Sequence, residues 1–229
     1  REIGLDVLDT LRRVGFTRLS IGVQDFDKQV QQAVNREQDN DFIRALLERA
    51  RELGFNSSNL DLIYGLPLQT RASFRHTLEQ VVDCRPARLS VFNYAHLPAR
   101  FAGQHKIRED QLPSAADKLA MLQDTISFLT SAGYQYIGMD HFALPDDELA
   151  EAQRAGCLHR NFQGYTTQGN CDLLGLGVSA ISMLGDAYAQ NQKDLKAYYA
   201  SLDEQGHAQC KGVGLSRDDL IRRDLIKRL

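Results

Sequence analysis

The sequence predicts an α/β fold in which parallel strands alternate with helices. Short runs rich in β-forming residues occupy residues 18–24, 59–65, 88–94 and 134–140, and helical runs at 39–53, 71–83 and 113–132 lie between them. Strands that are joined through helices pair in parallel by right-handed crossovers, either in a barrel or in an open sheet. A complete eight-unit barrel takes about 250 residues, so four units correspond to half of one.

The helical runs have clear limits in the sequence. Gly54 and Gly133 end two of them, and Gly15 ends a further helical run at the start of the chain, as expected of a residue that adopts the left-handed conformation at a helix C-terminus. The run at 113–132 has an apolar face at helical spacing. This face consists of Leu119, Leu122, Ile126 and Leu129. Two strands are closed by leucine–proline pairs, at 66–67 and 97–98.

The remaining part of the chain, residues 144–229, departs from this alternation. It contains a helical pattern near 146–155, a polar segment at 159–170 and a glycine-rich apolar stretch at 173–184. Further helical patterns follow Gln192 and Ser216. Apolar residues at helical spacing also run up to both ends of the sequence, from which we expect an excerpt of a longer protein.

Composition excludes several classes of protein. The 229 residues carry 27 Lys+Arg against 30 Asp+Glu, a net charge of −3, whereas a nucleic-acid binder shows a basic excess or stripe. No apolar run approaches the roughly 20 residues of a membrane span, and no leader opens the chain. Four separated cysteines form no zinc-type pair or disulfide framework. These cysteines are Cys84, Cys157, Cys171 and Cys210. We expect a cytoplasmic protein without nucleic-acid or membrane partners.

Polar side chains gather where the predicted strands end. In parallel α/β proteins, ligands bind at these carboxyl ends. The residues concerned are Gln24, Asp25, Asp61, Tyr64, Asn93, Tyr94, His96, Asp140 and His141. They predict a functional pocket, although strand ends also lead into loops, which are polar for other reasons.

More specific chemistry has weaker support. His96, Asp140 and His141 have the side chains of a zinc or iron site, but no HxH or HExxH spacing accompanies them. A serine hydrolase would need a GxSxG turn, which is missing. Glycines at 175, 177 and 185 resemble a phosphate-binding loop without its register, and close backbone packing explains them equally well. The polar segment 159–168 fits either a ligand-gripping segment or an exposed loop.

Five segments together resemble the oxygen-independent coproporphyrinogen III oxidases, which are radical enzymes dependent on S-adenosylmethionine. They are RLSIGVQDF at 18–26, NLDLIYGLPLQT at 59–70, VFNYAHLP at 91–98, IGMDHFA at 137–143 and HRNFQGYTTQ at 159–168. The resemblance covers essentially the whole chain. The GLPxQT motif is shared with related haem-trafficking proteins, whereas GMDHFA and HRNFQGYTTQ are particular to the oxidases.

The resemblance implies a partial (β/α)6 barrel, of which residues 1–143 would be the C-terminal part. Residues 144–229 would form an extension and the start of a mostly α-helical C-terminal domain. The resemblance also implies a 4Fe–4S cluster held by a CxxxCxxC motif, together with one or two molecules of S-adenosylmethionine as cofactor. A 5′-deoxyadenosyl radical would remove hydrogen from two propionates of coproporphyrinogen III, which would lose carbon dioxide and become the vinyl groups of protoporphyrinogen IX.

The cluster motif is missing from these 229 residues, so the chain alone should not hold the cluster and should be inactive. When the family's cofactor-contacting positions are matched to this sequence, the resemblance implies S-adenosylmethionine binding by Gln24, Arg36, Asp61 and Ala95. A second S-adenosylmethionine would contact Gln163 and Ile181. No catalytic residue or metal ligand is assigned.

The substrate's four carboxylates call for cations, and the candidates are Arg100, Arg160, His96 and His141. An electron donor such as a flavodoxin-like protein is the expected protein partner of a monomeric enzyme. Two alternatives remain at this point. One is a haem chaperone of the same superfamily, and the other is a metal-independent barrel enzyme.

Overall fold

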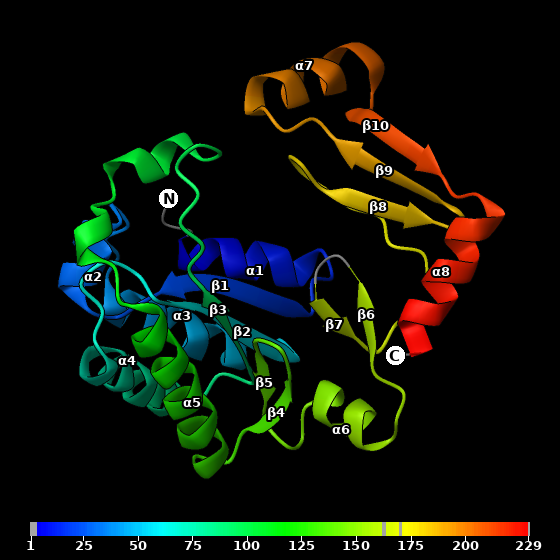
Figure 1. Cartoon of the computed structure of the whole chain (residues 1–229). Helices are drawn as coiled ribbons and strands as arrows, with labels where there is room; N and C mark the ends of the chain where they lie inside the picture. The colour runs from blue at the N-terminus through cyan, green and yellow to red at the C-terminus, as the bar shows by residue number, and fades with distance from the viewer. Residues whose placement is uncertain (1–3, 162–163, 170, 229) are drawn as a thin grey trace. The chain divides into compact units, whose positions relative to one another are not determined.

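The computed structural model describes residues 4–161, 164–169 and 171–228 (Figure 1). The chain divides into two compact units, Arg1–Gln153 and Arg154–Leu229. Each unit contains its own β-structure, and each is described by itself below. None of the described helices has the length and apolar character that crossing a membrane requires.

The first unit is built on a five-stranded sheet with the order β1-β2-β3-β5-β4. Its first three strands are β1 (Arg18–Gln24), β2 (Ser57–Tyr64) and β3 (Arg88–Asn93). They pair in parallel, with Ile21 opposite Leu60 and Leu60 opposite Leu89. The predicted parallel pairing of these strands is therefore confirmed.

The prediction of one continuous strand at 134–140 is wrong. The chain forms β4 (Gln135–Gly138), turns through Met139, and returns as β5 (His141–Ala143). The turn needs left-handed backbone, with φ of 140° at Gly138 and 50° at Met139. β5 pairs antiparallel with both β3 and β4, so β4 points the same way as β3 but is separated from it by the returning strand.

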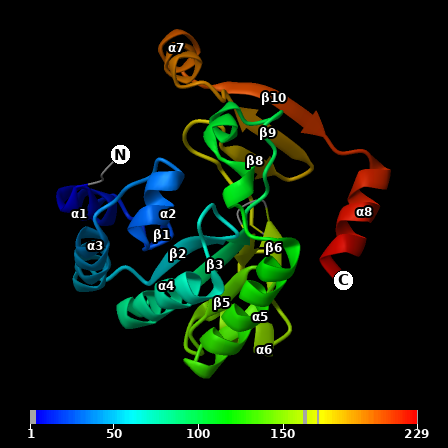
Figure 2. The ribbon, with the colours of Figure 1, turned by 60° about the vertical axis from the view of Figure 1, so that its left-hand side comes forward.

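Helices cover one face of this sheet, and α4 and α5 lie side by side on it (Figure 2). The helices are α1 (Leu5–Arg13), α2 (Lys28–Ala33), α3 (Asn40–Glu52), α4 (Arg71–Cys84), α5 (Ala115–Ser131) and α6 (Glu148–Arg154). The core contains Leu47 of α3, Phe74 of α4 and Met121 of α5, packed with Leu60 and Leu62 of β2. Leu119, which the sequence placed on the apolar face of its helix, is exposed.

The opposite face of the sheet is polar and only partly covered. Along β2 the burial alternates, so that Leu60, Leu62 and Tyr64 are buried while Asn59 and Asp61 are partly exposed. This alternation follows from the two-residue period of a strand, which points successive side chains to opposite faces. This face therefore presents polar side chains that remain partly accessible.

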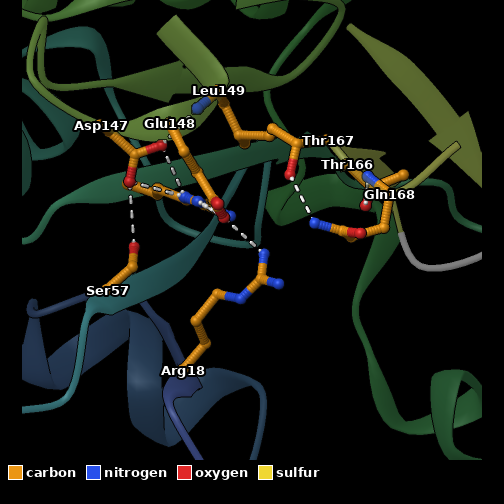
Figure 3. A network of polar contacts seen from close by, with 9 residues as sticks. Arg18, Ser57, Asp147, Glu148, Leu149, Thr166, Thr167 and Gln168 are labelled. Carbon is orange, nitrogen blue, oxygen red and sulfur yellow. Dashed lines mark hydrogen bonds and ion pairs between the residues drawn. The ribbon is translucent and has the colours of Figure 1, made fainter. Parts of the chain in front are cut away.

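An ion-pair network joins α6 to the first residues of the parallel strands (Figure 3). The Nε–H of Arg88 donates to Asp147 Oδ2 at 2.8 Å, and its Nη2 donates to Glu148 Oε1 at 2.8 Å. Arg18 also donates to Glu148, at 2.7 Å, and Ser57 donates its hydroxyl to Asp147 at 3.1 Å. The network thus links β1, β2 and β3 at the end of the sheet opposite to the predicted site.

The second unit contains two antiparallel sheets. β6 (His159–Asn161) pairs with β7 (Gly164–Thr166), so part of the polar segment is a hairpin. β8 (Ile181–Leu184), β9 (Ala187–Asn191) and β10 (Gln209–Gly214) form a sheet in the order β10-β9-β8. Helices α7 (Leu195–Gln205) and α8 (Arg217–Arg228) confirm the helical patterns after Gln192 and Ser216.

The sequence predicted no strands after residue 143, where an extension and the start of a mostly helical domain were expected. Strands β6 to β10 and their turns take up much of the described part of 154–228. The strands are three to six residues long, and β8 arises inside the glycine-rich stretch. Runs that short have too few residues for a strand period to be recognised in the sequence.

Candidate functional site

A row of paired residues crosses the partly exposed face of the first unit's sheet. Gly22 pairs with Asp61, Asp61 with Ser90, and Ser90 with His141. Directly paired residues place their side chains on the same face, about 5 Å apart. Asp61 and His141, which come from distant parts of the sequence, therefore lie on one surface beside Gly22.

Gly22 leaves the space in which two predicted cofactor-binding side chains lie. A Cβ at this residue would be 2.7 Å from Gln24 Nε2 and 3.0 Å from Arg36 Nη2. Arg36 Nη2 donates to the Gly22 carbonyl oxygen at 3.1 Å. Gln24 has a φ of 70°, and the pairing of β1 with β2 shifts between Gly22 and Gln24. This irregularity turns the Gln24 side chain back over Gly22.

The Asp61 carboxylate is fixed by two neighbouring side chains. Its Oδ1 accepts from Asn59 Nδ2 at 2.7 Å, and its Oδ2 accepts from Ser20 Oγ at 3.1 Å. Asn59 Nδ2 also lies 3.0 Å from Ser20 Oγ, which closes the triangle. Because a carboxylate accepts about four hydrogen bonds, Asp61 can still accept from a ligand hydroxyl or ammonium group.

The buried Asp25 connects the loop after β1 to the GLPxQT motif. Its carboxylate accepts from Thr77 Oγ1 and Gln69 Nε2, both at 2.5 Å, and from the backbone N–H of Asp27 at 2.7 Å. Gln69 also donates to Ile63 O, at 2.9 Å. Burial raises the pKa of Asp25 more than these hydrogen bonds lower it. The motif residue Gln69 thus holds together the ends of β1 and β2.

Ala95 lies on the loop after β3, at the same edge of the sheet. The loop begins where the Tyr94 N–H donates to Tyr64 O at 2.9 Å. The Tyr94 hydroxyl is 3.0 Å from His96 Nδ1, and His96 Nε2 is 3.3 Å from Glu109 Oε1. Ala95 is exposed between these anchored neighbours.

The structure therefore brings Gln24, Arg36 and Asp61 together around Gly22, with Ala95 on a neighbouring loop. The two residues predicted to contact a second S-adenosylmethionine belong to the range of the second unit. Ile181 begins β8 of the second unit, and Gln163 lies outside the described residues.

In the glycine-rich stretch, Gly175 serves close backbone packing, whereas Gly177, and Gly185 just after the stretch, have open space at the Cβ position and positive φ angles of 99° and 54°. A Cβ at Gly175 would lie 2.6 Å from the carbonyl oxygen of Ile181 and 3.0 Å from its nitrogen. The Gly175 N–H donates to Ser182 Oγ at 3.0 Å. Of the two interpretations that the sequence left open for these glycines, the packing one accounts for Gly175.

The candidate substrate-binding cations come from both units of the chain. Arg100 is exposed and lies 5.9 Å from the ring centre of Phe101. Arg160 belongs to β6 of the second unit, where it lies 5.6 Å from the ring centre of Tyr165. His141 stands edge-on to Phe92, with 6.1 Å between ring centres.

The described residues do not fit a cluster or a metal ion. They contain no group of three or more His, Cys, Asp or Glu side chains that could hold a metal, so His96, Asp140 and His141 do not assemble. Cys84 is buried, and Cys157, Cys171 and Cys210 are exposed in the second unit. Iron–sulfur clusters need several thiolates at close quarters, and this chain does not supply them.

Comparison with known proteins identifies the family. The model of the radical SAM superfamily matches residues 2–81. The oxygen-independent coproporphyrinogen III oxidase of Escherichia coli K12 is 68% identical over 229 residues, covering 100% of this chain and 50% of that protein. The protein of the same name from Thermostichus vulcanus is 50% identical over 220 residues, covering 95% of this chain and 67% of that protein. This chain belongs to the oxygen-independent coproporphyrinogen III oxidase family.

A solved structure of a family member supports the assignment. The Escherichia coli coproporphyrinogen III oxidase, described as a radical SAM enzyme, superposes with a TM-score of 0.92 at 68% identity, covering 100% of this chain and 53% of that one. This chain spans about half the length of the curated coproporphyrinogen III oxidases that head the comparison. Radical SAM enzymes use S-adenosylmethionine with an iron–sulfur cluster, and the residues around Gly22 suit the former.

Sequence reasoning missed three residues that shape this candidate site. Gly22 provides its space, and Ser20 and Asn59 hold its carboxylate. A usable signal was present for Gly22, because a glycine inside a strand often marks a close approach. Ser20 and Asn59 had no such signal, since their contacts depend on the pairing of β1 with β2.

Proposed function

We propose that this chain is the S-adenosylmethionine-binding part of an enzyme that oxidatively decarboxylates coproporphyrinogen III. The convergence of Gln24, Arg36 and Asp61 around Gly22 carries the proposal. Family membership supplies the substrate and the reaction, because the relatives are named for them. The product of the complete enzyme is protoporphyrinogen IX, formed when two propionates become vinyl groups.

Each residue of the site has a distinct role in this proposal. The Arg36 guanidinium pairs with the carboxylate of the methionine moiety, since its planar donors match a carboxylate. Asp61 accepts from a ribose hydroxyl or from the ammonium group, and Gln24 orients the ligand with its amide. Ala95 lacks a bulky side chain and leaves room for the adenine. The bound cofactor supplies the radical that removes a hydrogen atom from a propionate.

Wider features of the enzyme follow from the family. Residues 1–143 form the C-terminal part of a partial (β/α)6 barrel, which the three parallel strands support. Residues 144–229 form an extension and the start of the C-terminal domain. A second S-adenosylmethionine lies against Gln163 and Ile181, and a flavodoxin-like protein delivers electrons to the monomeric enzyme.

The test uses the full-length protein with its cluster reconstituted under anaerobic conditions. Asp61→Ala should lower the affinity for S-adenosylmethionine at least about tenfold, which corresponds to about 1.4 kcal/mol. Asp83→Ala, which removes an exposed carboxylate at the end of α4, should leave the affinity unchanged. Unchanged affinity in Asp61→Ala would refute the site.

The haem chaperone is the second candidate function, and the same protein distinguishes it. The wild type should convert coproporphyrinogen III to protoporphyrinogen IX with release of two carbon dioxide molecules. Stoichiometric haem binding without either product would favour the chaperone. The GMDHFA and HRNFQGYTTQ segments favour the oxidase.

A further inference from the structure

A side-chain amide contacts the backbone on both sides of the segment around Ala95. Gln104, from the short 3₁₀ helix η1 (Ala102–Lys106), accepts the Leu97 N–H at Oε1, 2.5 Å away. Its Nε2 donates to the Ala95 carbonyl oxygen at 3.1 Å. One amide therefore bridges two residues of an irregular segment that β-sheet pairing does not order.

The same segment is held from its other end by Lys118 of α5. Its Nζ donates to the Tyr94 carbonyl oxygen at 3.2 Å and lies 5.8 Å from the centre of the Tyr94 ring. The lysine stem reaches this position by crossing Gly65, where a Cβ would be 2.7 Å from Cε. Gly65 also has a φ of 84°, so both its conformation and the lysine stem require a glycine.

These contacts matter because the segment follows β3, and β3 pairs with the strand that carries Asp61. Fixing one residue's backbone costs about 1–2 kcal/mol in conformational entropy. A ligand that binds to backbone groups binds more tightly when that backbone is already ordered in the free protein. Adenine offers both a donor and acceptors along one edge, so its recognition by a backbone depends on the exact placement of N–H and C=O groups.

We infer that Gln104 and Lys118 are positioning residues that fix the Ala95 backbone for recognition of the adenine of the cofactor. Neither side chain needs to touch the ligand. Gln104 sets the direction of the Ala95 carbonyl group, and Lys118 sets where the segment leaves β3. This inference rests on the proposed function, because it assumes that an adenosyl group binds beside Ala95.

The test measures base recognition and needs no turnover. S-adenosylhomocysteine and S-inosylhomocysteine are titrated calorimetrically into the full-length protein. They differ only at the base, where inosine has a carbonyl oxygen in place of the amino group. Gln104→Leu removes both amide contacts, and Lys118→Met removes the ammonium group but keeps an unbranched stem over Gly65. Lys106→Met, at an exposed lysine of η1, is the control.

The wild type and Lys106→Met should prefer the adenine compound. In Gln104→Leu and Lys118→Met the affinity for that compound should fall about tenfold, or about 1.4 kcal/mol, while the affinity for the inosine compound changes little. The preference should therefore shrink in both variants. Should Gln104→Leu fail to fold, Gln104→Glu keeps the acceptor for Leu97 and loses only the donor to Ala95, and it should show the same loss of preference.

Two results would overturn the inference while the proposed function stands. One is an unchanged preference in both variants. The other is an equal loss of affinity for the two compounds, which is the signature of a general structural defect. A wild type that binds neither compound would instead refute the proposed function, and the inference with it.

Discussion

Arg36 and Gly22 are in direct contact across the loop that follows β1. The guanidinium donates to the Gly22 carbonyl oxygen at 3.1 Å and lies 3.0 Å from the point that a Cβ at residue 22 would occupy. The missing side chain thus lets a residue beyond α2 reach the polar face of the sheet. It also makes the arrangement of the site sensitive to a single methyl group.

Gly22→Ala should therefore displace Gln24 and Arg36 without unfolding the protein. The atoms that a Cβ would meet are the ends of flexible side chains, which can move aside. We expect the affinity for S-adenosylhomocysteine to fall about tenfold, and the free energy of unfolding to change by less than about 1 kcal/mol, because alanine is favoured over glycine in a strand. Isothermal titration and urea denaturation measure the two quantities.

Gly103→Ala is the matched control for that substitution, because a Cβ there would have no neighbour within 4 Å. It should leave the affinity unchanged. An unaltered affinity in Gly22→Ala would show that the positions of Gln24 and Arg36 do not matter for binding.

Gly175→Ala should disturb the second unit by a different route. The added Cβ would meet backbone atoms of Ile181, at 2.6 Å from the carbonyl oxygen, and backbone cannot rotate aside as a side chain can. We expect a loss of about 1–3 kcal/mol in stability, the usual cost of an overpacked contact, and faster amide hydrogen exchange in β8 and β9. Gly214→Ala, where a Cβ would have no neighbour within 4 Å, should change neither. Unaltered exchange in Gly175→Ala would contradict the packing interpretation.

The sequence predicted the first unit well because local patterns determine it. Helix α3 has its Asp39 N-cap and the Gly54 stop, and the parallel strands are long enough to show their burial. The β4–β5 hairpin was missed because its reversal occurs within two residues, Met139 and Asp140, inside a run that looks like one strand. The sheet of the second unit was missed because pairing between distant short segments leaves no local period.

The candidate site was likewise predicted only in part from the sequence. Asp61 and Gln24 were predicted from their positions near strand ends and from the family resemblance. The roles of Gly22, Ser20 and Asn59 depend on which residues stand opposite each other in β1 and β2. That register is a tertiary property, and a single amino-acid sequence contains no direct record of it.

Arg88→Met should destabilise the first unit strongly. It would leave the Asp147 carboxylate, whose side chain is 4% exposed, without its charged partner. Removing one member of a buried ion pair costs about 3–5 kcal/mol, and we expect the lower end because Ser57 and the Leu149 N–H still donate to Asp147. Urea denaturation measures the loss.

Arg108→Met is the control for the buried pair, because it breaks the solvent-exposed contact with Asp110. It should cost less than about 1 kcal/mol. Equal losses in the two variants would mean that burial of the Arg88 network contributes nothing to its strength.

Asp25 should make stability fall as the pH rises. Burial raises its pKa above the ordinary value of 3.8. Between the ordinary pKa and the raised pKa, the native protein therefore binds more protons than the unfolded chain. In that window the free energy of unfolding decreases with increasing pH. Asp25→Asn removes this dependence. The stability of the wild type relative to Asp25→Asn should therefore be greatest near the ordinary pKa and should decline toward neutral pH.

Asp110 provides a control of opposite sign. Its hydrogen bond with Arg108 lowers its pKa, so its contribution is present above the ordinary pKa and is lost as the pH falls through the lowered one. The stability of the wild type relative to Asp110→Asn should rise with pH below the ordinary pKa of 3.8 and level off above it, whereas the stability relative to Asp25→Asn should fall only above 3.8. Urea titrations at a series of pH values compare the two. A rising difference for Asp25→Asn would mean that its hydrogen bonds with Thr77 and Gln69 outweigh the cost of burying the charge.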